Sequence, residues 1–165
     1  MREFAAVAVA LTLASPVAAQ TSAHDTSHAS HAKGDTAFAA LQARGKIAMG
    51  VDQYTSKHRF EPLPDGGRIE LQRLEDDAAG TATIREHLQA IAHAFVEGDF
   101  STPAYVHWRE VPGAATIARK RAQLRVIYKP LPRGGQLRLQ SKDPEVVKAI
   151  HEFLAFQRGD HRAGE

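Results

Sequence analysis

Histidine and methionine side chains are the residues of this sequence that could bind a metal ion. The chain of 165 residues has nine histidines, two methionines and no cysteine. Imidazole nitrogens suit copper and zinc, and a thioether sulfur favours Cu(I). Met49 is the one methionine besides the initiator. Copper is therefore the ligand that we expect first, held through imidazole and thioether rather than through thiolate.

The histidines fall into two groups that differ in the kind of segment that carries them. A polar run near the N-terminus carries His24, His28 and His31. Binding there should be weak, because ordering a flexible segment costs about 1–2 kcal/mol per residue. The candidates for a tighter site in the folded domain are Met49, His58, His87, His107 and His151. Since neutral imidazole is the binding form, we expect affinity to fall as the pH drops through about 6.5.

A buried histidine is also a common structural residue, so the metal hypothesis requires several of them to converge in space. The short segment after Met49 leaves a similar choice open, because it contains Asp52 and Gln53 as candidates for ligand contact. In the other interpretation, Met49 packs in the core while Asp52 and Gln53 bond the backbone of a turn.

Motifs for nucleophilic or phosphate chemistry are missing. The sequence has no Gly-x-Ser-x-Gly elbow and no Walker loop. The alternative to a metal-binding protein is a small enzyme that uses His107 or His151 as a general base. We favour a non-enzymatic ligand-binding protein, and a protein-interaction module of the cell envelope is the third interpretation.

The N-terminus is typical of a Sec-type signal peptide. An apolar run from Phe4 to Leu13 precedes Ala19, after which we expect cleavage. We therefore expect residues 1–19 to be a signal peptide, 20–35 a flexible His-rich tail, and 36–165 one domain, in the periplasm or secreted. No other apolar run approaches the roughly 18 residues that a membrane span needs. The net charge of +2 is too small to suggest a nucleic acid partner. A small ligand, an envelope protein or a second copy of the chain remain the expected partners.

Two stretches of the domain are near-copies of each other. PLPDGGRIELQ begins at Pro62 and PLPRGGQLRLQ at Pro130, an offset of 68, with seven identical positions of eleven. Strand-like alternation surrounds each copy, and an amphipathic helical pattern follows it. The pattern predicts a duplicated ββα unit over 57–98 and 124–159, folded as a two-layer α+β sandwich. It would have a four-stranded antiparallel sheet, both helices on one face and an additional N-terminal helix.

The expected element boundaries follow from the periodicity and from capping residues. We expect strands over 57–63, 68–74, 124–130 and 136–141. Helices are expected over 36–49 with Asp35 as its cap, over 82–97 with Gly98 as its C-cap, over 114–121, and from Asp143 to Gly159. Residues 99–113 contain two prolines and are expected to be irregular.

From Met49 onward the chain resembles a group of small exported bacterial proteins of no established function. The shared pattern is MG-x-DQ, H-x-F, DGG, IR-x-HL, GDF, VH, VPG and IH-x-FL-x-FQ-x-x-DH. Some similar chains carry the label aspartate carbamoyltransferase, but the Ser-Thr-Arg-Thr phosphate loop of that enzyme is absent here. The resemblance draws attention to the residues Met49, Asp52, Gln53, His58, His87, His107 and His151.

Overall fold

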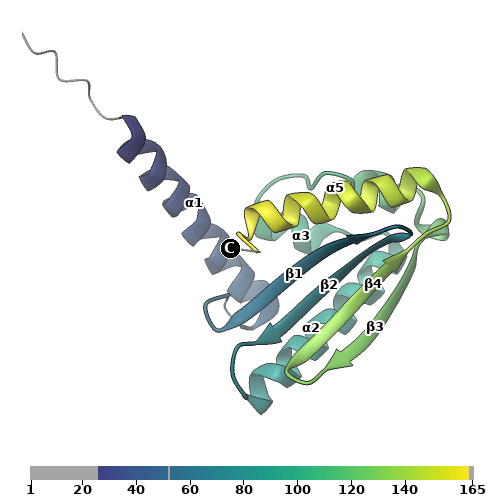
Figure 1. Cartoon of the computed structure of the whole chain (residues 1–165), viewed down its shortest axis with the longest axis horizontal. Coiled ribbons are helices and arrows are strands. Elements are labelled where there is room, and N and C mark those ends of the chain that lie inside the picture. Colours follow the sequence, from purple (N-terminus) through teal and green to yellow (C-terminus); the bar gives the residue numbers. More distant parts are fainter. Residues whose placement is uncertain (1–25, 52, 164–165) are drawn as a thin grey trace, which may run out of the picture.

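A four-stranded antiparallel sheet carries a layer of helices (Figure 1). This computed structural model describes the backbone of residues 26–51 and 53–163, and their side chains from residue 35 onward. The strands are β1 (Ser56–Leu63), β2 (Gly66–Arg73), β3 (Arg125–Leu131) and β4 (Gly134–Gln140). The helices are α1 (Thr26–Met49), α2 (Ala78–Glu97), α3 (Ser101–His107), α4 (Ala114–Arg119), the short 3-10 helix η1 (Arg121–Gln123) and α5 (Pro144–Asp160). The α+β class predicted from the sequence is confirmed.

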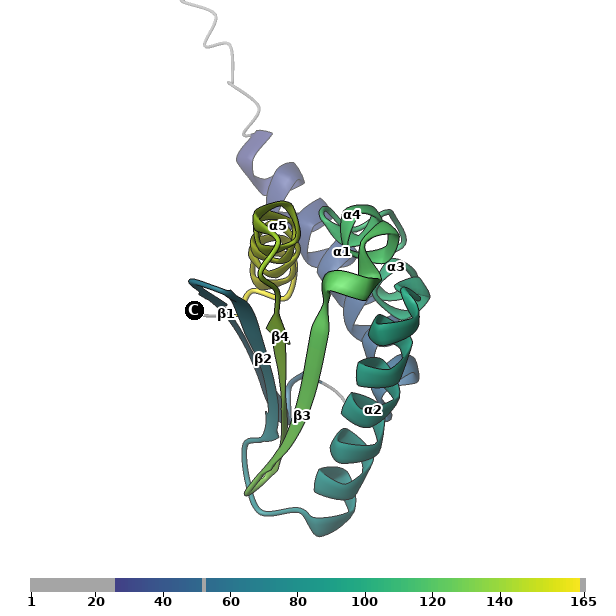
Figure 2. The same cartoon turned by 90° about the vertical axis from the view of Figure 1, so that its right-hand side faces the viewer.

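The strand order β1-β2-β4-β3 places one strand of each hairpin at the centre of the sheet. Ile69 on β2 pairs with Leu137 on β4, and these residues are equivalent in the two sequence copies, because 137 − 69 = 68. The helices cross over between the halves: α2 packs on β3 and β4, whereas α5 packs on β1 and β2. Figure 2 shows both helices on the same side of the sheet. Each half therefore covers strands of the other half.

The core lies between the sheet and these helices. Alternation along the strands turns one set of side chains inward, and helical spacing on α2 and α5 supplies the opposing set. The residues with at most 1% of their surface exposed include Leu71, Ile84, Phe95, Leu137, Leu139, Ile150, Phe153 and Leu154. Full burial of such a side chain stabilises the fold by about 1.5–3 kcal/mol relative to leaving it exposed.

Helix α1 begins ten residues earlier than the sequence predicted, at Thr26 instead of Thr36. It runs through part of the segment expected to be a tail, and Asp35 lies inside it rather than capping it. The added stretch contains two alanines, Ala29 and Ala32, which are strong helix formers, and its polar composition did not prevent a helix. Among the described residues, no helix combines the length and the apolar character that a bilayer-spanning segment needs.

Caps define the ends of α2 and α5 well. Asp143 accepts hydrogen bonds from the amides at the start of α5, and Gly98 ends α2 with a φ of 80°, both as predicted. However, α2 begins at Ala78 rather than Ala82, because Asp77 accepts a hydrogen bond from Gly80 N and caps it earlier. Helix α5 also passes through Gly159 and ends at Asp160.

The segment 99–113 was expected to be irregular, but it contains the helix α3. Its proline, Pro103, lies in the first turn, where a missing N–H costs no helical hydrogen bond. The ring of Phe100 anchors the start of the helix, with its centroid 4.3 Å from that of Phe95. Trp108 ends it in the left-handed conformation with a φ of 54°. The prolines of this segment suggested a loop, but aromatic packing orders part of it as a helix.

Two glycines allow a direct test of the packing of α4 against α5. Gly113 has a φ of 80°, and a Cβ there would collide with the carbonyl oxygen of Ala149 on α5. Gly113→Ala should therefore lower the free energy of unfolding by about 2 kcal/mol or more, measured by urea denaturation. Gly159→Ala is the control, because nothing lies within 4 Å of its added Cβ, and it should change stability by less than about 1 kcal/mol. Equal effects of the two substitutions would contradict the packing of α4 against α5.

Candidate functional site

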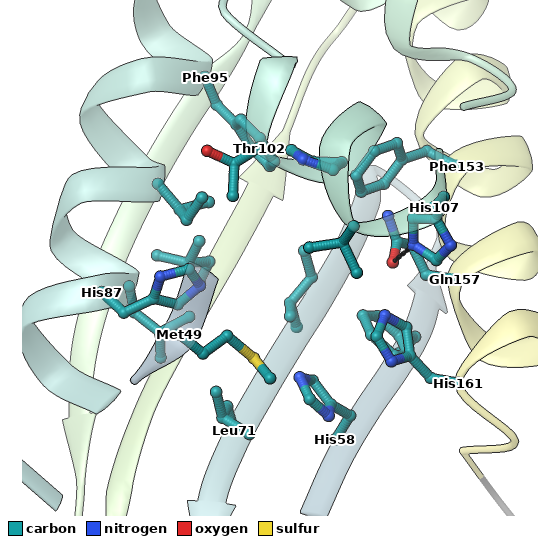
Figure 3. Close-up of a pocket in the computed structure, with 17 residues that line it drawn as sticks. Met49, His58, Leu71, His87, Phe95, Thr102, His107, Phe153, Gln157 and His161 are labelled. Carbon is teal, nitrogen blue, oxygen red and sulfur yellow. Dashed lines mark hydrogen bonds between the residues drawn. The ribbon is translucent and has the colours of Figure 1, made fainter. Parts of the chain in front are cut away.

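A cavity of about 80 Å³ lies inside the domain, between the sheet and the helices α1, α2, α3 and α5 (Figure 3). Most of its lining is aliphatic or aromatic, and its polar side chains are few. We call it the histidine pocket, because it is lined by His58, His87, His107 and His161, together with Met49 and Gln157. A small number of polar groups on an apolar wall is typical of ligand sites.

His58 reaches the pocket from β1, where alternation turns it to the inner face between Ser56 and Phe60. It is 8% exposed, and its Nδ1 has no hydrogen-bond partner among the described residues. The ring is stacked with both Phe60 and His161, with centroid distances of 5.6 and 4.8 Å. Packing thus holds the ring while its Nδ1 is left without a partner.

His161 follows the last residue of α5 and is 5% exposed. Its Nδ1 lies 2.9 Å from Oε1 of Gln53, and the amide nitrogen of the same Gln53 donates to the carbonyl oxygen of His161. A single side chain from the segment before β1 therefore binds both the ring and the backbone of His161. This contact joins the end of the last helix to the start of the sheet.

His107, at the end of α3, has both ring nitrogens engaged. Nδ1 lies 2.5 Å from a carboxylate oxygen of Asp160, and Nε2 lies 2.8 Å from Oε1 of Gln157. Arg109 donates to the other carboxylate oxygen of Asp160 at 2.7 Å. The His107 side chain is only 1% exposed. Its nitrogens are thus committed to neighbours, and the ring is fixed with its centroid 5.1 Å from that of His161.

Met49 and His87 form the opposite side of the pocket. Met49 is the last residue of α1 and is 7% exposed. Figure 3 shows its thioether pointing into the pocket, toward His58. His87 comes from α2 and hydrogen-bonds the backbone of Ala48. The end of α1 is therefore held to α2 at the point where the thioether enters the pocket.

Burial keeps three of these imidazoles neutral. Desolvation, followed by repulsion from His87 and His107, lowers the pKa of His58 to about 4. Desolvation, followed by repulsion from His58 and His107, lowers the pKa of His161 to about 2. Desolvation also lowers the pKa of His87. At neutral pH these rings therefore offer uncharged nitrogen atoms.

The structure brings together four of the five residues expected to form a metal site, namely Met49, His58, His87 and His107. The fifth, His151, lies elsewhere: its Nε2 donates to the carbonyl oxygen of Leu63 at the end of β1, and it lines a separate surface hollow. Within the described residues, no group of three or more His, Cys, Asp or Glu side chains is arranged to hold a metal ion. The stacked rings of His58 and His161 explain part of this, because parallel rings do not aim their nitrogens at one point.

The remaining candidates either lie outside the described residues or do not line the cavity. Asp52, His24 and the expected signal peptide lie outside the described residues, whereas His28 and His31 lie on α1 with side chains that are not described. Gln53, the remaining candidate, contacts His161 rather than the cavity.

Sequence reasoning missed three residues of the site, Gln157, Asp160 and His161. Their spacing of i, i+3 and i+4 places them on one face at the end of a helix, and this spacing was a usable signal. The expected end of the helix at Gly159 placed Asp160 and His161 outside it.

Comparison with family models, with curated proteins and with solved structures finds no match to this chain. The function is therefore argued from the geometry of the histidine pocket.

The buried neutral imidazoles predict a loss of stability in acid. His58 is neutral in the folded state down to a pKa of about 4, but in the unfolded chain it gains a proton near pH 6.5. Its contribution is fully present above about pH 6.5 and is lost as the pH falls toward 4, which amounts to about 3 kcal/mol. Urea denaturation at pH 7 and pH 4.5 should show the wild type losing more stability than His58→Leu.

The matched control is His93→Leu, on the exposed face of α2. It should lose as much stability between the two pH values as the wild type does. A His58→Leu variant with the pH dependence of the wild type would show that His58 is not buried as a neutral ring.

Proposed function

We propose that this chain is an exported, non-enzymatic binding protein whose leading ligand is a copper ion, held as Cu(I) in the histidine pocket by Met49, His58 and His87. The observation that carries this proposal is the Nδ1 atom of His58, which is buried without a partner beside the pocket. Burying a polar group without a hydrogen bond costs about 1–3 kcal/mol. A ligand that binds this nitrogen would recover that cost.

The chemistry of the neighbouring side chains favours a soft cation. Met49 offers a thioether and His87 a second imidazole in the same pocket (Figure 3). Thioether sulfur selects Cu(I) over harder ions, and Cu(I) accepts low coordination numbers. Two imidazoles and one thioether therefore fit this ion, although no three His, Cys, Asp or Glu side chains of the described residues are arranged around one point.

The contacts of the other histidines favour binding over general-base catalysis. A general base must present a free ring nitrogen to its substrate. His107 uses both nitrogens on Gln157 and Asp160 and is almost fully buried. His151 donates to a backbone carbonyl and lines a different surface hollow. Both residues proposed for an enzyme are thus engaged in structural contacts.

The gathering of the histidines also favours a small ligand over a purely structural interaction module. An interaction module gives no reason for the ring of His161 to lie within about 5 Å of the rings of both His58 and His107, as it does here. The buried rings of His58 and His161 cost stability in acid, because burial lowers the pKa of each below its usual value. A bound cation would account for the clustering of these histidines.

Copper titration of the full, untagged chain tests the proposal. Cu(I) affinity would be measured by competition with a chromogenic chelator. His58→Leu and Met49→Leu should each weaken the tight site by about 100-fold, or about 2.7 kcal/mol. A variant with His24, His28 and His31 all changed to Asn should keep that site, since the tail binds only weakly. Thermal unfolding would confirm that each variant is folded.

The control is His93→Asn, an exposed histidine on α2, which should bind like the wild type. A wild type without Cu(I) binding, or a His58→Leu variant with unchanged affinity, would contradict the proposal. Because burial lowers the pKa of His58 to about 4, binding should persist well below pH 6.5. This revises the fall near pH 6.5 that free imidazole would give.

A further inference from the structure

A second hollow, of about 400 Å³, lies where α1 passes the ends of α3 and α5. Figure 1 shows the yellow end of α5 beside α1, and a hydrogen bond from Arg162 to Asp35 on α1 joins the two segments. We call this hollow the arginine groove, because three guanidinium groups and two aromatic rings line it. Its main lining residues are Phe38, Arg44, Trp108, Arg109, Asp160 and Arg162.

Two of the guanidinium groups are held in place by aromatic rings of the groove. Arg44 lies over the ring of Trp108, 5.9 Å from its centroid, and its Nε donates to the carbonyl oxygen of Val106 at 2.8 Å. Arg162 lies 4.2 Å from the centroid of the Phe38 ring. Such contacts restrict these long side chains in the free protein, so binding a ligand costs less side-chain entropy.

Positive charge exceeds negative charge in the arginine groove. Its cations are Arg44, Arg109 and Arg162. Among the described residues, the carboxylate of Asp160 is the one acidic group that lines it, and Asp35 lies beside it, 3.2 Å from Arg162. A guanidinium has five N–H donors, so a single contact with an oxygen leaves others that can bind a carboxylate of a ligand. The groove is therefore complementary to an acidic ligand that also has an apolar part.

Trp108 occupies a position that stability alone would not assign to it. It ends α3 in the left-handed conformation with a φ of 54°, where glycine is usual because a Cβ is strained there. The residue is nevertheless 74% exposed, so burial does not offset this strain. Backbone strain of this kind is concentrated at functional sites. Tryptophan and arginine are also the residues that contribute most to binding at protein interfaces.

We propose that the arginine groove binds an acidic segment of a partner protein, with carboxylates on the guanidinium groups and an apolar side chain against Trp108. The exposure of Trp108 favours a protein segment over a small molecule, because small-molecule sites enclose most of their ligand. The inference goes beyond the proposed function and does not depend on it, since no proposed copper ligand lines the groove.

Fluorescence of the full chain tests this binding directly, because Trp108 is its only tryptophan. The probes are two synthetic peptides: one has glutamates on both sides of a central leucine, and the other has lysines in their place. The acidic peptide should change the emission of Trp108 in a saturable way, and the basic peptide should leave it unchanged.

Three results of this titration would overturn the proposal. The first is an acidic peptide that binds no more tightly than the basic one. The second is acetate that saturates the same signal at the same concentration, which would assign the groove to a small carboxylate. The third is an emission that changes with protein concentration alone, which would assign it to a second copy of the chain.

Substitution of single arginines locates the site. Arg44→Gln and Arg162→Gln should each weaken binding of the acidic peptide by about 3-fold to 5-fold, as expected for one partly exposed charge contact. Arg125→Gln is the matched control, because it removes the same charge from β3, outside the groove, and should bind like the wild type. Equal weakening in all three variants would show a general effect of net charge and would overturn the proposed site, as would unchanged affinity in both groove variants.

Trp108→Gly separates binding from stability. Glycine adopts a φ of 54° without strain, so the variant should unfold at nearly the same urea concentration as the wild type. Its binding, followed by amide ¹H–¹⁵N chemical shifts, should be weaker by about 10-fold or more. A marked loss of stability would show that the fold itself requires Trp108, and unchanged affinity would place Trp108 outside the interface; either result would overturn the proposal.

Discussion

The stacked rings of Phe60, His58 and His161 are the contact on which the rest of the site depends. They join the inner face of β1 to the residue that follows α5, with centroid distances of 4.8 to 5.7 Å. Because α5 covers β1 and β2, this stack lies where the second half of the chain closes over the first half. It is favourable only while both imidazoles are uncharged, since two adjacent imidazolium ions in a buried site would repel each other.

Polar neighbours supply the precision that packing alone does not. Gln53 binds the ring and the carbonyl oxygen of His161, while Asp160 and Gln157 bind the two nitrogens of His107. His58 differs from both, because its Nδ1 has no partner within the described part of the chain. The pocket therefore combines the ring of His107, whose two nitrogens both have partners, with that of His58, whose Nδ1 has none among the described residues, beside the soft sulfur of Met49. This contrast separates the structural histidines from the proposed ligand.

The sequence predicted much of the fold because its signals were local and repeated. Strand alternation, the two PLP-x-GG turns and the caps at Gly98 and Asp143 lie within a few residues of the structures that they determine. Helix starts were less predictable: α1 begins at Thr26, within a polar stretch that contains a glycine, and α3 forms because the Phe100 ring packs on Phe95. Such aromatic contacts are invisible to a local pattern.

The candidate site was predictable in part and for a different reason. Residue type alone nominated Met49, His58, His87 and His107, and all four line one pocket. Residue type could not separate them from His151, because the difference is a hydrogen bond to Leu63, 88 residues away. The role of His161 depends on Gln53, at a separation of 108 residues. Long-range partners decide which histidines line the pocket and which of their nitrogens are engaged, and no spacing in the sequence encodes these partners.

X-ray absorption at the copper edge tests the central claim most directly. The sample would be the full chain with His24, His28 and His31 changed to Asn, loaded with one equivalent of Cu(I), so that tail ligands cannot contribute. The account predicts a spectrum with both a sulfur shell from Met49 and imidazole scattering, and loss of the sulfur shell in Met49→Leu. A first shell of nitrogen and oxygen only, unchanged by Met49→Leu, would contradict it.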